Sequence, residues 1–139
     1  MNLTLESDYA LRIVYHLAYC GEMLDAARLS ETVGVSLRFT LKILRKLRLA
    51  GLLRSFKGAG GGYALARPAE TITMYDVIVA IEGDIPVSRC TAQGYECGHP
   101  DVRQGLPCPI RHIFIDLADT VKGQLNAVNF ADLIKARTE

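Results

Sequence analysis

Three of the four cysteines in this sequence lie close together, and they have the clearest capacity for chemistry. Cys90, Cys97 and Cys108 follow the spacing C-x6-C-x10-C, whereas Cys20 stands apart from them. In a chain without a secretion signal the thiols are expected to stay reduced, so clustered cysteines favour metal or redox chemistry over structural disulfides. Three thiolates on a flexible loop can surround an iron–sulfur cluster, which takes cysteine ligands.

Two other roles for these cysteines stay open. A thiol switch, in which two of the three form a disulfide, needs no metal, and the loop could also lack a chemical function. Zinc fits less well, because structural zinc sites favour a C-x2–4-C pair. Cys108 directly precedes Pro109, which suits the first position of a helix, and a thiolate at a helix N-terminus is a good ligand or nucleophile. Cys20 is expected to be a small buried residue.

The cysteines are predicted to lie on a long loop that is followed by a long helix. Residues 83–107 form an irregular loop of 25 residues, and a loop of this length in a compact protein usually has a function. Beyond it, apolar residues recur at spacings of three and four: Ile110, Ile113, Phe114, Leu117, Val121, Leu125 and Val128. Such a helix usually packs against a second copy, so we expect a homodimer; the alternative is an ordinary core helix. Residues 130–134 are predicted to fold back as a short helix.

Basic residues are concentrated in the middle of the chain, although the net charge is only +1. Residues 32–69 contain no acid and eight bases: Arg38, Lys42, Arg45, Lys46, Arg48, Arg54, Lys57 and Arg67. A solvated cationic face usually includes acids that pair at i,i+4, and this segment has none. The distribution therefore favours a polyanion, nucleic acid above all, as the partner.

Three helices are predicted to position these bases. They cover residues 7–20, 26–33 and 37–49, and their N-caps are Ser7, Asp25 and Ser36. The helices are expected to end at Gly21, Gly34 and Gly51. Two short helices joined by a tight turn with glycine form the helix-turn-helix pattern. A fourth helix, capped by Thr73, is expected over residues 74–82.

The third helix has the two faces that a recognition helix requires. Its leucines are expected to face the core: Leu37, Leu41, Leu44 and Leu47. Arg38, Lys42 and Arg45 share the opposite face. Such a helix packs through one face and meets phosphates and base edges in the major groove through the other. The candidate DNA contacts on this helix are Ser36, Arg38, Thr40, Lys42 and Arg45.

Two short apolar runs after the third helix predict the hairpin wing of a winged helix. Strands about Leu52-Leu53 and residues 63–65 flank a polar tip over residues 55–62 that holds four glycines. Glycine permits positive φ and lets backbone N–H groups approach a phosphate. The candidate DNA contacts on the wing are therefore Arg54, Lys57, Gly60 and Gly61. A nucleotide-binding loop is disfavoured, because neither a Lys-Ser/Thr pair nor a helix follows the glycines.

Several classes of protein are disfavoured. No run of about 18 apolar residues predicts a membrane span, and the N-terminus has no secretion signal, so a cytoplasmic location is expected. We find no nucleophile–base pair, paired carboxylates or cofactor fingerprint, and therefore expect no enzyme.

In order along nearly the whole chain, its motifs resemble those of the Rrf2 family of bacterial transcription regulators. The matching segments are LT from residue 3, DYALR from 8, VS from 35, LRKLR from 44, AGL from 50, GAGGGY from 58, IEG from 81, the three cysteines and NFADL from 129. The resemblance implies a mainly α fold, in which a winged helix-turn-helix with a small β-hairpin wing precedes a long C-terminal dimerisation helix.

The resemblance also implies a cofactor and partners. Members of the family bind operator DNA as dimers, and many carry an iron–sulfur cluster, of 2Fe–2S or 4Fe–4S type, that controls binding. Cys90, Cys97 and Cys108 would be its ligands. For the fourth ligand, Asp8 matches a carboxylate that nitric-oxide-sensing relatives supply from the partner subunit, and His112 lies near the histidine used by the iron–sulfur assembly regulator.

Together these features predict a DNA-binding domain over residues 1–82, a cysteine-bearing sensor loop over residues 83–108, and a dimerisation helix with a C-terminal segment over residues 109–139. The expected function is that of a dimeric transcription repressor whose operator affinity is switched by an iron–sulfur cluster or by redox state. A cluster-free thiol switch or a partner-controlled regulator is the alternative. A redox or metal-handling protein whose winged helix docks another protein is disfavoured by the acid-free basic segment.

Overall fold

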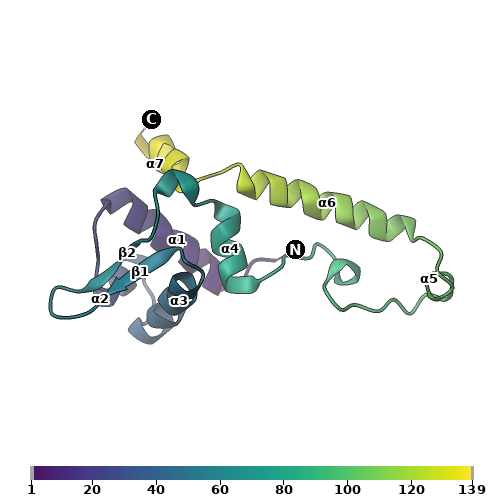
Figure 1. Cartoon of the computed structure of the whole chain (residues 1–139), viewed down its shortest axis with the longest axis horizontal. Helices are drawn as coiled ribbons and strands as arrows, with labels where there is room; N and C mark the ends of the chain where they lie inside the picture. Colours follow the sequence, from purple (N-terminus) through teal and green to yellow (C-terminus); the bar gives the residue numbers. More distant parts are fainter. Residues whose placement is uncertain (1, 139) are drawn as a thin grey trace.

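The computed structural model describes residues 2–138, and it is mainly helical with one two-stranded antiparallel hairpin (Figure 1). The elements in chain order are α1 (Leu5–Cys20), α2 (Ala26–Val33), α3 (Leu37–Leu49), β1 (Leu53–Phe56), β2 (Gly62–Leu65), the 3-10 helix η1 (Ala69–Thr71), α4 (Met74–Glu82), the 3-10 helix η2 (Arg89–Thr91), α5 (Pro100–Arg103), α6 (Pro109–Asn126) and α7 (Phe130–Thr138). This order confirms the predicted winged helix-turn-helix followed by a long helix.

The helices of residues 2–82 begin where polar side chains accept hydrogen bonds from free backbone N–H groups. Asp25 caps α2 and Ser36 caps α3, as predicted. The predicted cap of α1 is wrong, because α1 begins at Leu5 and Thr4 is its N-cap. Ser7 lies instead within the first turn, where it is fully buried.

The face that α3 buries differs in part from the predicted face. Its buried side chains are Thr40, Ile43, Leu44 and Leu47. Leu37 and Leu41, which were expected to face the core, are 46% and 42% exposed. Residues 40, 43, 44 and 47 keep the spacing of a single helix face, and that face packs against α1, α4 and β1. Leu37 and Leu41 fall beside this face.

The wing is a two-stranded hairpin, and one residue before α2 forms an isolated bridge to it. β1 and β2 pair in an antiparallel register that places Leu53 opposite Leu65. Leu24, between α1 and α2, exchanges two backbone hydrogen bonds with Tyr63, at 3.0 and 2.8 Å. A Cβ at Gly62 would lie 2.5 Å from the Leu24 carbonyl oxygen, so glycine permits this close pairing.

The last helix returns to the N-terminal helices and completes their core. Phe130 is 1% exposed and packs among buried residues of α1, α3 and α4. Its N–H donates to the Ile72 carbonyl at 3.1 Å, and the Met74 N–H donates to the Val128 carbonyl at 2.9 Å. The predicted fold-back helix is confirmed, and it packs on α1 and η1.

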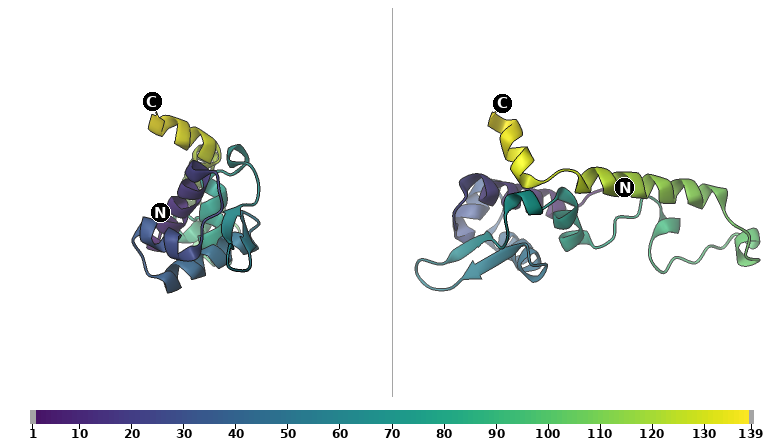
Figure 2. Two further views of the ribbon diagram at one scale, coloured as in Figure 1. Left: turned by 90° about the vertical axis from the view of Figure 1, so that its left-hand side faces the viewer. Right: turned by 45° about the horizontal axis from the view of Figure 1, so that its top comes forward.

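The sensor loop and α6 (residues 83–126) extend as an arm from the body that the other helices and the hairpin form (Figure 2). Cys108 is the N-cap of α6 and Pro109 its first residue, as predicted. The loop is less irregular than expected, because η2 and α5 form within it. No residue of α6 is fully buried, and Ile110, Ile113 and Leu117 are 67%, 60% and 47% exposed. These three side chains share one helix face and leave an apolar stripe uncovered in the single chain.

One carboxylate fastens the end of α4 to the start of α1. Glu82 Oε1 accepts hydrogen bonds from the Thr4 N–H at 2.7 Å, the Thr4 hydroxyl at 2.9 Å and the Ser7 hydroxyl at 2.6 Å. Burial by itself raises the pKa of Glu82, but these hydrogen bonds outweigh it, and the pKa lies below its ordinary value of 4.5. The sensor loop begins at residue 83, so the hydrogen bonds of Glu82 hold the start of the loop against α1.

We expect Glu82→Gln to lower the free energy of unfolding at neutral pH by about 1–2 kcal/mol, because it weakens hydrogen bonds to a charged acceptor. A carboxyl group with a lowered pKa in the folded state stabilises above its unfolded pKa and loses that contribution as the pH falls through the folded pKa. The difference in the free energy of unfolding between wild type and variant should therefore be largest at neutral pH and shrink below pH 4.5. Urea unfolding across this range measures it, with the exposed Glu70→Gln as control. A difference that does not depend on pH would contradict the assignment.

Candidate DNA interface and cysteine pocket

The exposed face of α3 carries most of the predicted recognition residues. Arg38, Lys42 and Arg45 are exposed, and Ser36 lies at the start of the helix. Within residues 2–138, Arg38 and Arg45 form no ion pair, so their guanidinium groups are available to a ligand. Thr40 is 0% exposed and its hydroxyl donates to the Ser36 carbonyl at 3.0 Å. Its prediction as a DNA contact is wrong, because its side chain points into the core.

One acid from outside the basic segment lies against α3, and the sequence analysis missed it. Glu6, in the first turn of α1, forms ion pairs with Lys46 Nζ at 2.8 Å and Lys42 Nζ at 3.5 Å. Its side chain is only 16% exposed, whereas that of Lys42 is 58% exposed. Residues 32–69 contain no acid, so only the packing of α1 beside α3 reveals this partner.

The wing presents its basic and glycine residues at the surface. Arg54, Lys57 and Gly60 are exposed, and Gly61 is partly exposed. Of the four tip glycines only Gly58 has a positive φ, of 100°. Gly61 is needed for a different reason, because a Cβ there would collide with the backbone at the end of β1. The tip therefore combines a tight turn with an accessible backbone, as contact with a phosphate requires.

The three clustered cysteines line one pocket of about 280 Å³ at the N-terminal end of α6. Cys90, Cys97 and Cys108 are all partly buried free thiols. Arg111 joins the two ends of the sensor loop, because its Nε donates to the Cys90 carbonyl at 3.0 Å and its backbone N–H donates to Cys108 Sγ at 3.5 Å. Tyr95 lies in the same pocket. We call this site the cysteine pocket.

Three other predicted residues lie outside the cysteine pocket. His112 is exposed on α6 and does not line the pocket, and Asp8 on α1 pairs with Arg12 at 3.0 Å. Among the described residues of one protomer, no three His, Cys, Asp or Glu side chains gather closely enough to hold a metal ion. Cys20 is exposed, not buried as expected, because it ends α1 on the outer face, with Sγ 3.6 Å from His16 Nε2.

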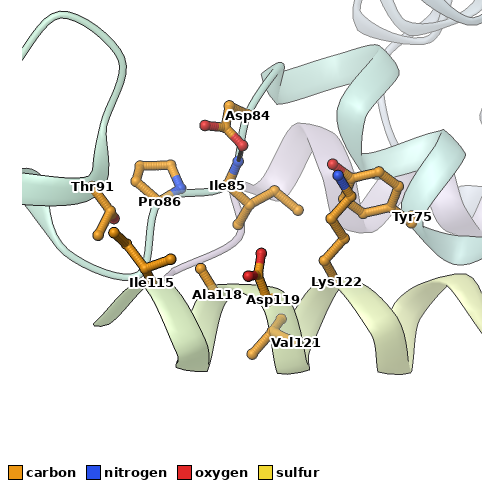
Figure 3. Close-up of a pocket in the computed structure, with 10 residues that line it drawn as sticks. All are labelled: Tyr75, Asp84, Ile85, Pro86, Thr91, Ile115, Ala118, Asp119, Val121 and Lys122. Carbon is orange, nitrogen blue, oxygen red and sulfur yellow. Dashed lines mark hydrogen bonds between the residues drawn. The ribbon is translucent and has the colours of Figure 1, made fainter. Parts of the chain in front are cut away.

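A second cavity, of about 190 Å³, lies where the arm meets the body (Figure 3). It is lined by α4, by the start of the sensor loop and by α6. Lys122 Nζ of α6 lies 5.2 Å from the ring centroid of Tyr75 on α4, a cation–π contact across the junction. Ile85 and Pro86 lie on the loop side of the cavity (Figure 3). The junction of the arm and the body therefore contains a cavity beside direct contacts between α4 and α6.

Comparison with known proteins shows the family. The model of the Rrf2 family, described as an iron-dependent transcriptional regulator, matches residues 3–136. The chain belongs to the Rrf2 family. An HTH-type transcriptional regulator of Haemophilus influenzae is 31% identical over 99% of this chain and 89% of the relative, and the regulator IscR of Vibrio campbellii is 30% identical over 97% and 78%. The structure of CymR, the global cysteine regulator of B. subtilis, has 25% identity and a TM-score of 0.76, and the match covers 98% of both chains.

Membership of the Rrf2 family establishes the general role of the protein. It is a DNA-binding transcription regulator and not an enzyme, as the sequence predicted. Among residues 2–138, no helix is both long enough and apolar enough to cross a membrane.

Proposed function

We propose that this Rrf2 regulator is a homodimeric repressor whose affinity for operator DNA is set at the cysteine pocket. The pocket is the observation that carries the proposal, since it brings Cys90 and Cys97 of the loop together with Cys108 at the start of α6. All three are free thiols. In a family described as iron-dependent, this donor set fits an iron–sulfur cluster, whose ligands are cysteine thiolates.

The DNA-binding domain would place α3 in the major groove and the wing over the neighbouring minor groove. The residues in contact with DNA would be Ser36, Arg38, Lys42 and Arg45 from α3, and Arg54, Lys57, Gly60 and Gly61 from the wing. The uncovered stripe of α6 would pair with the same stripe of a second copy. The operator would then be a near-palindrome with half-sites separated by about one helical turn or more.

The sensor loop would link the cysteine pocket to DNA binding. Arg111 of α6 holds the loop through its hydrogen bonds to Cys90 and Cys108. An iron–sulfur cluster, of 2Fe–2S or 4Fe–4S type, would supply a redox-sensitive centre in the pocket. Ligation by the three cysteines would further restrain the loop, with Asp8 of the partner subunit or His112 as the fourth ligand. A restrained and a relaxed loop would favour different spacings of the two recognition helices, and hence different affinities for DNA.

Anaerobic purification tests the cysteine pocket. We expect brown wild-type protein with absorption at about 400 nm and with bound iron and sulfide. Cys90→Ala, Cys97→Ala and Cys108→Ala should each lose the colour and the iron, because each removes a ligand. Cys20→Ala is the matched control, since it removes a thiol outside the pocket and should keep both. Colourless, iron-free wild-type protein would refute the cluster but would leave the DNA-binding role unchanged.

A cluster-free thiol switch is the second candidate. It is favoured by the lack, among the described residues, of three metal-ligating side chains in close contact, and by similarity to CymR, a cysteine regulator. Hydrogen peroxide would oxidise two pocket thiols to one disulfide and be reduced to two waters. Mass spectrometry of the treated protein would show the loss of two hydrogens and identify the bonded pair. That loss would disappear when either cysteine of the pair is replaced by alanine but persist in Cys20→Ala.

A further inference from the structure

The contact between Glu6 and the recognition helix has no role in the proposed mechanism so far. Glu6 brings one carboxylate to two lysines of α3, at 2.8 Å from Lys46 Nζ and 3.5 Å from Lys42 Nζ. The Lys46 side chain is 35% exposed and that of Lys42 is 58% exposed, so both ammonium groups also reach solvent. The carboxylate therefore lies beneath the basic face of α3, where it restrains two long flexible side chains.

The position of Glu6 is fixed by its neighbours in the chain. Thr4 and Ser7, on either side of it, both donate hydrogen bonds to Glu82 at the end of α4. Tyr9, one turn further along α1, packs edge-on against Phe39 of α3, with ring centroids 5.9 Å apart. The first turn of α1 is thus held on α4 and α3 independently of the two ion pairs.

The charge at this contact opposes DNA binding that does not depend on sequence. Attraction of lysines to phosphates supplies most non-specific affinity, and each phosphate that a lysine neutralises steepens the salt dependence. A carboxylate beside two of these lysines offsets part of that attraction, and it also selects among their rotamers. Arg38 and Arg45 have no such carboxylate partner among the described residues, so no nearby acid offsets their attraction to DNA in the major groove.

We propose that Glu6 is a positioning residue that restrains Lys42 and Lys46 and lowers the affinity of the regulator for non-operator DNA. The proposal rests on the proposed role of α3 as the recognition helix. It assigns to α1, which carries none of the predicted DNA contacts, a part in the specificity ratio between operator and non-specific DNA.

Binding to a random-sequence duplex at several KCl concentrations tests this proposal without knowledge of the operator. We expect Glu6→Gln to bind this duplex about threefold to tenfold more tightly than wild type at low salt, with a slope of log Kd against log salt that is steeper by about one unit. Glu6→Asp, which keeps the charge, should remain close to wild type. Glu70→Gln removes the same charge from η1, which packs against α7, and should leave both quantities unchanged.

A double-mutant cycle separates positioning from a structural role. If Glu6 acts through the lysines, its effect on duplex affinity should depend on them. In a Lys42→Gln/Lys46→Gln background, Glu6→Gln should change the affinity by less than about half of the free-energy change that it causes in wild type. Circular dichroism and thermal unfolding of each variant check that the fold is kept. If wild type binds the duplex but Glu6→Gln leaves affinity and slope unchanged, the inference about Glu6 is overturned while the DNA-binding role stands. If wild type shows no salt-dependent duplex binding at all, the proposed DNA interface falls, and Glu6 with it.

Discussion

Leu117→Glu is expected to convert the protein from a dimer to a monomer. Leu117 is 47% exposed, belongs to the apolar stripe of α6 and lies near the middle of the helix. In a two-fold symmetric interface the substitution introduces two carboxylates, one from each copy, into an apolar contact. Burying an unpaired charge costs several kcal/mol, so the dimer dissociation constant should rise by about a thousandfold or more.

Sedimentation velocity measures this change directly, and operator binding should weaken with it. A dimer gains affinity because the second half-site is engaged at high effective concentration, and a monomer loses that gain. Gly123→Glu is the matched control, since it adds the same charge on another face of α6, where a Cβ meets nothing within 4 Å. Dimeric Leu117→Glu protein with unaltered DNA binding would show that α6 is not the dimer contact.

Replacing Arg38 and Arg45 together by alanine should weaken operator binding by about a hundredfold or more. Both guanidinium groups are exposed on one face of α3 and neither is engaged in an ion pair within residues 2–138. An arginine that contacts a guanine or a phosphate contributes about 1–3 kcal/mol, and losing two phosphate contacts lowers the salt slope by about two units. Loss of base contacts would relax specificity at defined positions.

An operator duplex selected from a random library by the wild-type protein provides the ligand for this measurement. Lys135→Ala/Arg137→Ala removes the same charge from the last turn of α7, outside the proposed DNA interface, and should bind the duplex as wild type does. The core of α3 is untouched by the substitutions, because Ile43, Leu44 and Leu47 remain buried. Equal affinity and slope in the two double variants would remove α3 from the DNA interface.

Local patterns were sufficient for most of the secondary structure. Four predicted helix starts are confirmed: the N-caps Asp25, Ser36 and Thr73, and Pro109 at the first position of α6. Such signals act within a few residues of the helix start, so a local pattern is enough to predict them. The cap of α1 was misplaced, because Thr4 and Ser7 offer equivalent local chemistry. Ser7 is drawn inward by Glu82, a residue 75 positions away.

The roles of several side chains depended on contacts that no local pattern contains. On α3, Leu37 and Leu41 are exposed although they were expected in the core, and Thr40 is buried although it was expected at the surface. The packing of α3 against α1, α4 and β1 decides which of its faces is buried. Cys20 is exposed at the last position of α1, where its only side-chain hydrogen-bond contact within residues 2–138 is with His16.

The sequence by itself determined the fold class, the family, the basic segment and the cluster of three cysteines. These follow from residue types and their spacing, and spacing fixes which side chains share a helix face or a turn. Only the tertiary structure brought Cys90, Cys97 and Cys108 into one pocket, placed Glu6 against Lys42 and Lys46, and returned Phe130 to the core of the first domain. Such contacts join segments whose relative position is set by the packing of whole elements, and the energies that decide this packing are spread over many residues far apart in the chain.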